Sequence, residues 1–197
     1  MAKKNMMIIE DHPLMLRGLN EYFKKSKKWN VKGIASNLVQ AKALLAESSF
    51  DLVLLDIQLE DGWGLDIIPS LPQNPLPIIA VYSAFDTYAY VSTALSMGVR
   101  AYVTKRSSED DLEKALLKAL KGEVYIDDGA RLKLQTVSDI RDLLTKRERE
   151  ILSLVISGLS NLEIAENLSL SRRTIENILS CIYDKTGVRS RLELQKL

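Results

Sequence analysis

Residues 52–56 read Leu-Val-Leu-Leu-Asp, four apolar side chains in succession followed by a carboxylate. A second uninterrupted apolar run covers Ile78–Tyr82 and is followed by Ser83. Both runs have the length of a strand, and neither shows the alternation of a strand that has one face in water. Strands covered on both faces are typical of parallel sheets. These two runs therefore predict the centre of a parallel sheet.

The chain around these runs alternates between strand and helix patterns over residues 1–122. Three further short apolar runs have strand length: Met6–Ile9, Val31–Ala35 and Ala101–Val103. Between the strands, apolar residues recur three and four positions apart, as on amphipathic helices. These stripes are Leu16, Leu19, Tyr22 and Phe23, then Leu38, Ala41 and Leu45, then Leu112, Ala115, Leu116 and Ala119. The alternation predicts an α/β domain with a five-stranded, doubly wound parallel sheet of flavodoxin-like order 2-1-3-4-5.

The pattern changes after Gly122. Residues 123–142 show no clear period and contain a turn signal at Asp127-Asp128-Gly129, so we interpret them as a linker with room for a short helix. Residues 143–197 predict an all-α domain of the helix-turn-helix kind, because Thr145 and Ser160 each precede a Glu by three positions, as in a capping box. The four predicted helices lie near residues 146–157, 161–168, 171–186 and 190–197.

The composition is that of a globular protein. Of 197 residues, 46% are hydrophobic and 27% charged, which excludes collagen-like, low-complexity and disordered chains. The single cysteine, Cys181, excludes an internal disulfide and a cysteine metal cluster, and a reducing cytoplasm is the expected compartment. The apolar stretch Met6–Ile9 is too short for a signal peptide or a membrane span.

Charge is close to balanced over the whole chain, at a formal net +1. This excludes a protein that coats nucleic acid by bulk electrostatics. Residues 171–197, however, contain six Lys or Arg and three Asp or Glu. This local excess of +3 is compatible with nucleic-acid binding at the C-terminus.

Three carboxylates follow two strands that the predicted order makes neighbours. Glu10 and Asp11 come after the first strand and Asp56 after the third. Ligands of such sheets bind outside the carboxyl ends of the strands where the strand order reverses. Carboxylates placed together repel unless a cation joins them, and hard oxygen ligands favour Mg²⁺. The sequence therefore predicts a magnesium site.

Two further polar groups end the fourth and fifth strands. Ser83 supplies a hydroxyl and Lys105 an ammonium at the same edge. A nucleophilic carboxylate, a metal ion, a hydroxyl and a lysine are the groups that formation of an aspartyl phosphate requires. His12, the only histidine, has no second His or Cys near it in the sequence, and we interpret it as a surface residue at a helix start.

These motifs resemble a known family. Glu10-Asp11-His12-Pro13, Leu54-Leu55-Asp56-Ile57, Ser83-Ala84 and Tyr102-Val103-Thr104-Lys105 are similar to the receiver domain of bacterial two-component response regulators. Leu144-Thr-Lys-Arg-Glu148, Gly158-Leu-Ser-Asn161, Ser171-Arg-Arg-Thr-Ile-Glu176 and Lys185-Thr-Gly-Val-Arg189 are similar to the LuxR-type helix-turn-helix. Together they resemble the NarL/FixJ type of response regulator over nearly the whole chain.

The resemblance implies roles for the residues of the first domain. Asp56 would be the phosphoacceptor, and Lys105 would pair with the phosphoryl group. Mg²⁺ would be held by Asp11, Asp56 and the carbonyl of Gln58, with Glu10 assisting. Ser83 and Tyr102 would form the activation switch. Arg106 stands where the family usually has Pro, which leaves the geometry of that turn open.

The helix that begins after Ser171 is the expected DNA-reading element. On a helical wheel its apolar stripe is Ile175, Ile178, Leu179 and Ile182, and the opposite face carries Arg173, Asn177, Ser180 and Asp184. A cation, an amide and a hydroxyl suit base edges and phosphates in the major groove. The family often has Lys at Glu176 and usually has His at Ile178. The expected DNA-binding residues are Arg172, Arg173, Glu176, Asn177, Ser180 and Lys185.

The sequence thus predicts a transcription regulator that is not an enzyme. A histidine kinase would transfer a phosphoryl group to Asp56, and homodimers formed on phosphorylation or DNA binding would occupy double-stranded promoter DNA. Two alternatives stay open. A haloacid-dehalogenase-like phosphatase would also use an Asp nucleophile, but Gln58 occupies the position of its second Asp. A signalling module could instead act through protein contacts without binding DNA.

Overall fold

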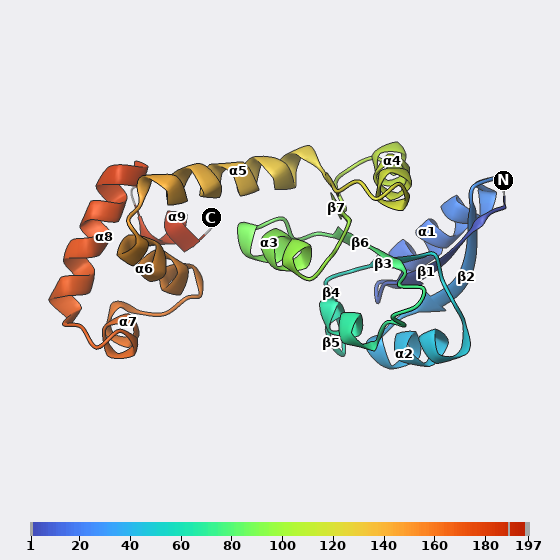
Figure 1. Cartoon of the computed structure of the whole chain (residues 1–197), viewed down its shortest axis with the longest axis horizontal. Helices are drawn as coiled ribbons and strands as arrows, with labels where there is room; N and C mark the ends of the chain where they lie inside the picture. The colour runs from blue at the N-terminus through green and yellow to red at the C-terminus, as the bar shows by residue number, and fades with distance from the viewer. Residues whose placement is uncertain (1, 189, 196–197) are drawn as a thin grey trace. The chain divides into compact units, whose positions relative to one another are not determined.

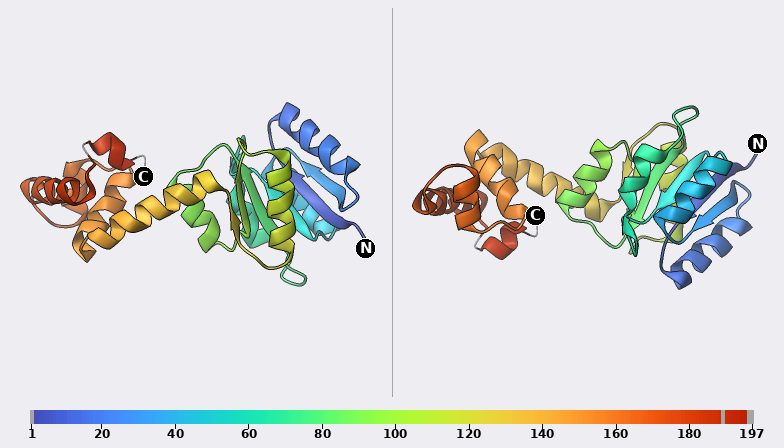
Figure 2. Two further views of the ribbon diagram at one scale, coloured as in Figure 1. Left: turned by 90° about the horizontal axis from the view of Figure 1, so that it is seen from above. Right: turned by 90° about the horizontal axis from the view of Figure 1, so that it is seen from below.

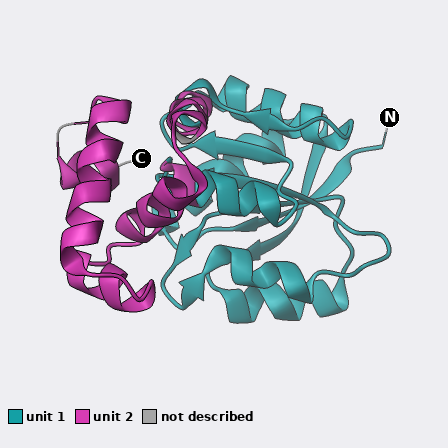
Figure 3. Ribbon diagram, turned by 60° about the vertical axis from the view of Figure 1, so that its left-hand side comes forward, with its two compact units in different colours: residues 1–86, 90–130 teal, residues 87–89, 131–197 magenta. Residues whose placement is uncertain are grey.

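The computed structural model describes residues 2–188 and 190–195. It divides into two compact units, residues 1–86 with 90–130 and residues 87–89 with 131–197 (Figure 3). Strands of the first unit are β1 (Lys4–Ile9), β2 (Trp29–Ala35), β3 (Leu52–Leu55), β4 (Gln58–Leu59), β5 (Gly62–Trp63), β6 (Ile78–Ser83), β7 (Ala101–Thr104) and β8 (Tyr125–Ile126). Helices between them are α1 (Pro13–Lys25), α2 (Leu38–Glu47), the 3₁₀ helix η1 (Gly64–Ser70), α3 (Tyr88–Ser96) and α4 (Glu109–Leu120) (Figure 1).

The central sheet confirms the predicted fold class. Its strands are parallel and stand in the order β2-β1-β3-β6-β7-β8. The first five, numbered along the chain as predicted, give the flavodoxin-like order 2-1-3-4-5. β8 adds a sixth strand of two residues at the edge, formed by part of the segment that we interpreted as linker. β4 and β5 make a separate small hairpin directly after β3.

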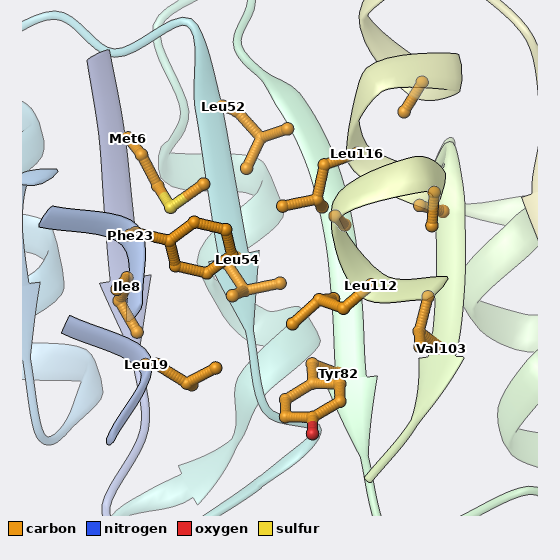
Figure 4. Packing of buried hydrophobic residues seen from close by; sticks show 14 of the residues in the cluster. Met6, Ile8, Leu19, Phe23, Leu52, Leu54, Tyr82, Val103, Leu112 and Leu116 are labelled. Atoms are coloured by element: carbon orange, nitrogen blue, oxygen red, sulfur yellow. The ribbon is translucent and has the colours of Figure 1, made fainter. Parts of the chain in front are cut away.

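Helices cover both faces of the sheet (Figure 2), as the apolar runs predict. On one face, Leu19 and Phe23 of α1 and Leu112 and Leu116 of α4 pack on alternate residues of the strands (Figure 4). These strand residues are Met6, Ile8, Leu52, Leu54, Tyr82 and Val103. Successive strand side chains point to opposite faces, so both faces of β3 are buried. The sheet is therefore packed between helices up to the carboxyl ends of its central strands.

The second unit is helical. α5 (Asp128–Leu143) begins in the first unit and continues into the second, where it is followed by α6 (Lys146–Ile156), α7 (Asn161–Asn167), α8 (Arg172–Thr186) and α9 (Arg191–Gln195). The predicted capping boxes are both present, at Thr145 for α6 and at Ser160 for α7. Gly187 ends α8 with a φ of 70°, a left-handed conformation that costs glycine little. One apolar cluster joins α6, α7, α8 and α9.

The segment 123–142 differs from the expected linker with a short helix. It contains β8 and most of α5, a helix of 16 residues. The predicted fourth helix of the last domain extends to residue 197, and residues 196–197 lie outside the described part of the chain, as does Arg189 of the family motif. Among the described residues, no helix is long and apolar enough to cross a membrane.

Candidate functional site: an acidic pocket and a DNA-reading helix

The predicted carboxylates meet because β1 and β3 are neighbours with their ends level. Ile9 pairs with Leu55 in the sheet, and the amide of Asp56 donates to the carbonyl of Ile9 at 2.9 Å. Glu10 and Asp56 are thereby brought together at the carboxyl edge, and both are buried. The pairing of β1 with β3 therefore places these two carboxylates next to each other.

Both carboxylate oxygens of Asp56 have donors. Oδ1 accepts from the hydroxyl of Ser83 at 2.7 Å and from the amide of Ile57 at 2.6 Å. Oδ2 lies 2.5 Å from the ammonium of Lys105. The structure therefore brings together the three residues that the sequence predicts for phosphoryl chemistry. These partners supply the interactions that water would give an exposed carboxylate.

Lys105 connects two of the three carboxylates. Its Nζ lies 2.8 Å from Oε2 of Glu10 in addition to its contact with Asp56. Burial disfavours the charged ammonium, but the hydrogen bonds to Asp56 and Glu10 outweigh it and raise the pKa of Lys105 above its usual value. The ammonium therefore provides a fixed positive charge at the point where phosphoryl oxygens would arrive.

His12 and Asp11 complete the acidic pocket. Nδ1 of His12 lies 2.9 Å from Oε1 of Glu10 and 2.8 Å from Oδ1 of Asp11. One ligand atom from each of Glu10, Asp11, His12 and Asp56 falls within 4.8 Å of the others. His12 is exposed at the start of α1, as interpreted from the sequence, and its contacts with Glu10 and Asp11 were not predicted.

The pocket fits a hard divalent cation. Its acidic members offer carboxylate oxygens, the ligands that Mg²⁺ prefers. Oδ1 of Asp11 is buried, and its near neighbour in the pocket is Nδ1 of His12 at 2.8 Å. Gln58, on β4, lines the same pocket as Asp11, Asp56 and Lys105.

Gly64 shapes the segment after Asp56 and was not found by sequence reasoning. Its amide donates to the carbonyl of Ile57 at 2.6 Å. A Cβ at this position would lie 1.9 Å from the carbonyl oxygen of Asp56, which only a displaced backbone could accommodate. Gly64 therefore allows the β4–β5 hairpin to turn back against the phosphoacceptor candidate.

Tyr102 lies buried on β7 with its hydroxyl donating to the carbonyl of Phe85 at 2.6 Å. Burial raises the pKa of Tyr102 far above its usual value, so the phenol stays protonated and keeps this hydrogen bond. The amide of Phe85 in turn lies 3.5 Å from the hydroxyl of Ser83. The predicted switch pair, Ser83 and Tyr102, thus contacts one segment, the residues that follow β6.

On α8 the burial pattern agrees with the helical wheel. Ile175, Leu179 and Ile182 are buried, and Ile178 is partly buried at the edge of the stripe. The predicted DNA-facing residues Arg173, Asn177 and Ser180 are exposed, as are Arg172 and Glu176. Ser171 caps the helix by accepting from the amide of Thr174.

Three of the predicted DNA-binding residues, Arg172, Glu176 and Lys185, have partners within the chain. Nε of Arg172 lies 2.8 Å from Oε1 of Glu176, one turn along the same helix. Nζ of Lys185 contacts both carboxylate oxygens of Glu148, at 2.9 and 2.7 Å. Glu148 also caps α6, and the hydrogen bonds from Lys185 and Thr145 lower its pKa to about 2. Lys185 therefore holds α8 against the start of α6.

Comparison with known proteins finds two family models. Residues 6–117 match the response regulator receiver domain, and residues 142–197 match bacterial regulatory proteins of the luxR family. The nitrate/nitrite response regulator protein NarL of Escherichia coli (strain K12) is 32% identical over 197 residues, covering 95% of this chain and 91% of NarL. The transcriptional regulatory protein ComA of Bacillus subtilis (strain 168) is 29% identical over 202 residues, covering 96% and 94%. A solved structure of two RcsB dimers bound to two parallel DNAs has a TM-score of 0.76 at 25% identity, covering 98% of this chain and 97% of the RcsB chain.

Proposed function

The chain belongs to the response regulators of the NarL/FixJ type, which are DNA-binding transcriptional regulators, and we propose that phosphorylation of Asp56 controls its binding to promoter DNA. The observation that carries the proposal is the setting of Asp56: a buried carboxylate at a strand end, with Ser83 on one oxygen and Lys105 on the other. Outside its own phosphorylation we assign the chain no enzymatic activity. A regulator of chromosomal DNA acts in the bacterial cytoplasm.

The phosphoryl donor we propose is a phosphohistidine of a sensor histidine kinase. A carboxylate oxygen of Asp56 attacks phosphorus, the P–O bond forms and the P–N bond breaks. The leaving nitrogen keeps the electron pair of the P–N bond, and the ring departs as neutral imidazole because its other nitrogen already carries a proton. Lys105 and Ser83 then transfer their hydrogen bonds from the carboxylate to phosphoryl oxygens. Because both groups are already within hydrogen-bond distance of Asp56, little reorganisation is needed.

Four residues would hold the Mg²⁺ ion: Glu10, Asp11 and Asp56 through carboxylates, and Gln58 through its carbonyl. The bound ion would supply positive charge that screens the incoming phosphoryl group from the carboxylates. The donor set supports this assignment, because one ligand atom from each of Glu10, Asp11 and Asp56 lies within 4.8 Å of the others.

Activation would pass through Ser83 and Tyr102. Ser83 lies between Asp56 and the amide of Phe85, and Tyr102 holds the carbonyl of that same residue. A hydroxyl drawn towards a phosphoryl oxygen would change its contact with the segment after β6. Such a contact can shift the balance between two conformations of the chain.

The DNA-reading element would be α8, with Arg173, Asn177 and Ser180 facing the major groove. Their exposure opposite the buried stripe supports the assignment. The similar RcsB is described as dimers bound to DNA, and we propose that this chain also binds as a homodimer, with one α8 per half-site. We assign Lys185 to the packing of α8, since Glu148 occupies its ammonium.

The decisive experiment is phosphorylation with acetyl phosphate and Mg²⁺, followed by intact-mass measurement. Wild-type protein should gain one phosphoryl group, and Asp56→Asn should gain none. Asp66→Asn, at an exposed carboxylate of η1, is the matched control and should behave as wild type. Full labelling of Asp56→Asn would overturn the assignment.

A gel-shift assay on genomic DNA fragments tests the second half of the proposal. Phosphorylated wild-type protein should retard a subset of fragments at lower concentration than unphosphorylated protein. Retardation of no fragment in either state would identify the chain as a module that acts through protein contacts.

A further inference from the structure

A buried carboxylate stands where the receiver sheet meets the helix that leads to the DNA-binding unit. Asp127 follows β8, directly before α5, and is buried. Its backbone amide donates to the carbonyl of Tyr102 at 3.0 Å, which fixes the residue beside β7. We interpreted Asp127 as part of a turn, and the mechanism above does not use it.

The two oxygens of this carboxylate serve two different elements. Oδ2 accepts from the amide of Thr104 at 2.5 Å and from the hydroxyl of Ser107 at 3.0 Å. Oδ1 accepts from the amide of Ala130 at 2.8 Å and so caps the first turn of α5. Burial alone would favour protonation, but these hydrogen bonds outweigh it and lower the pKa of Asp127, so the carboxylate is charged and acts only as an acceptor.

The residues bound by Oδ2 enclose Lys105. Thr104 is the residue before it and Ser107 lies two residues after it, and the amide of Ser107 donates to the carbonyl of Thr104 at 3.0 Å. Residues 104–107 are thus one closed turn, with Lys105 pointing to Asp56 and the turn itself held by Asp127. A displacement of Lys105 therefore acts on the same carboxylate that caps α5.

We propose that Asp127 is a positioning residue that couples the Lys105 turn to α5, so that the phosphorylation state of Asp56 is transmitted to the helix that precedes the DNA-binding helices. The inference rests on the proposed roles of Asp56 and Lys105. When Lys105 leaves the carboxylate of Asp56 for a phosphoryl oxygen, the 104–107 turn moves with it. The hydrogen bonds of Asp127 pass this movement to the first turn of α5, which continues to Leu143.

The variant that separates the two halves of the coupling is Asp127→Ser. Serine is a preferred N-cap residue and keeps an acceptor for the amide of Ala130, but its side chain is one atom shorter and has one oxygen instead of two. It should retain the helix cap and lose the attachment to Thr104 and Ser107. Glu123→Gln removes the same charge from an exposed position nearby and is the matched control.

The readout is the ratio of DNA affinities with and without phosphorylation, measured on the full-length chain at equal phosphoryl stoichiometry. In wild type and Glu123→Gln this ratio should lie in the range of about 5 to 150 that is typical of coupled sites. In Asp127→Ser we expect this ratio to fall below about 2. The affinity of the unphosphorylated protein for DNA should stay close to wild type, because the substitution removes the coupling to Asp56 and leaves the DNA-binding residues unchanged. An unchanged ratio would overturn the inference and leave the proposed function intact. Failure of wild type to be phosphorylated would instead overturn the proposed function.

Hydrogen exchange on the wild-type protein keeps the inference testable if Asp127→Ser does not fold. Phosphorylation should alter protection of the Thr104 amide and of the amides in the first turn of α5 together. A change at Thr104 with none in α5 would overturn the coupling.

Discussion

Nζ of Lys105 lies 2.5 Å from Oδ2 of Asp56, and the same ammonium lies 2.8 Å from Glu10. Both carboxylates are almost completely buried, with exposed fractions of 4% and 1%. Lys105 thus offsets one of the three carboxylate charges of the pocket, which leaves a formal negative charge for a cation to balance. We therefore expect the charges in this pocket to determine how substitutions and metal ions change the stability and the phosphorylation of the receiver domain.

Lys105→Met should destabilise the receiver domain, and Mg²⁺ should restore part of the loss. Removing one partner of a buried ion pair typically costs about 3–5 kcal/mol, because the other charge stays buried without compensation. A divalent cation between Glu10 and Asp56 replaces that compensation. The measurement is urea unfolding followed by tryptophan fluorescence with and without Mg²⁺, with the exposed Lys25→Met as control. Equal stability of Lys105→Met and wild type would contradict the electrostatic account.

Asp11→Ala should weaken the dependence of phosphorylation on metal without unfolding the domain. The carboxylate lines the pocket, and its near contact is with the exposed side chain of His12, at 2.8 Å. Titration of the phosphorylation rate with Mg²⁺ should give a half-saturating concentration raised by more than about tenfold. Asp66→Asn again serves as the control. Unchanged phosphorylation of wild type in excess chelator would show that no metal takes part.

Ser83→Ala and Tyr102→Phe should separate phosphorylation from its effect on DNA binding. Each variant removes one hydroxyl that contacts Phe85, and neither removes the nucleophile or Lys105. We expect both proteins to accept a phosphoryl group and to show a smaller gain in DNA affinity than wild type. Ser96→Ala, at an exposed hydroxyl of α3, should keep the full gain. A full gain in both switch variants would show that these hydroxyls are not the relay.

The sheet and the pocket were predictable because they follow from local patterns. Strand ends carry Glu10, Asp56, Ser83 and Lys105, and a parallel sheet places all such ends at one edge. The role of Asp127 was not predictable in this way. Asp and Gly favour turns, but Asp is also a preferred N-cap residue, so Asp127-Asp128-Gly129 fits either a loop or the start of α5.

The other features that the sequence did not predict depend on tertiary contacts between residues distant in sequence. Lys185 and Glu148 lie 37 positions apart, and only the packing of α8 on α6 brings them together. An exposed basic residue near a helix end has the same sequence pattern whether it binds a phosphate or a carboxylate. The approach of Gly64 to the carbonyl of Asp56 likewise depends on the β4–β5 hairpin and not on spacing.

Glu148→Gln should destabilise the helical unit at neutral pH and lose this effect in acid. The pKa of Glu148 is lowered to about 2 from its usual value of 4.5, so its contribution is present above about pH 4.5 and is lost as the pH falls towards 2. At neutral pH we expect a loss of about 1–3 kcal/mol, from the cap and the ion pair together. Both tryptophans, Trp29 and Trp63, lie in the receiver. Circular dichroism should therefore show a destabilised transition that tryptophan fluorescence does not report.

Arg173→Ala should weaken DNA binding by roughly 1–3 kcal/mol if the guanidinium reaches a base edge, and it should relax sequence preference at one position. The side chain is exposed on the face opposite the apolar stripe. A contact to phosphate alone would instead weaken all sequences equally and reduce the salt slope by about one. Competition binding to a panel of single-base variants distinguishes these two modes. Unchanged affinity at two salt concentrations would remove Arg173 from the interface.

Arg172 should contribute to DNA binding only when Glu176 releases it. The two side chains are both exposed and lie 2.8 Å apart on one face of α8, so the carboxylate competes with any phosphate for the guanidinium and also repels it. Glu176→Gln should therefore raise non-specific affinity and steepen the dependence of log K on log salt by about 0.9, the value for one additional phosphate contact. Arg172→Ala should have little effect in the wild-type background and a larger one in Glu176→Gln, which a double-mutant cycle at two salt concentrations measures directly. Equal effects of Arg172→Ala in both backgrounds would show that the ion pair does not regulate this arginine. An unchanged affinity in Glu176→Gln would place this face of α8 away from the phosphates.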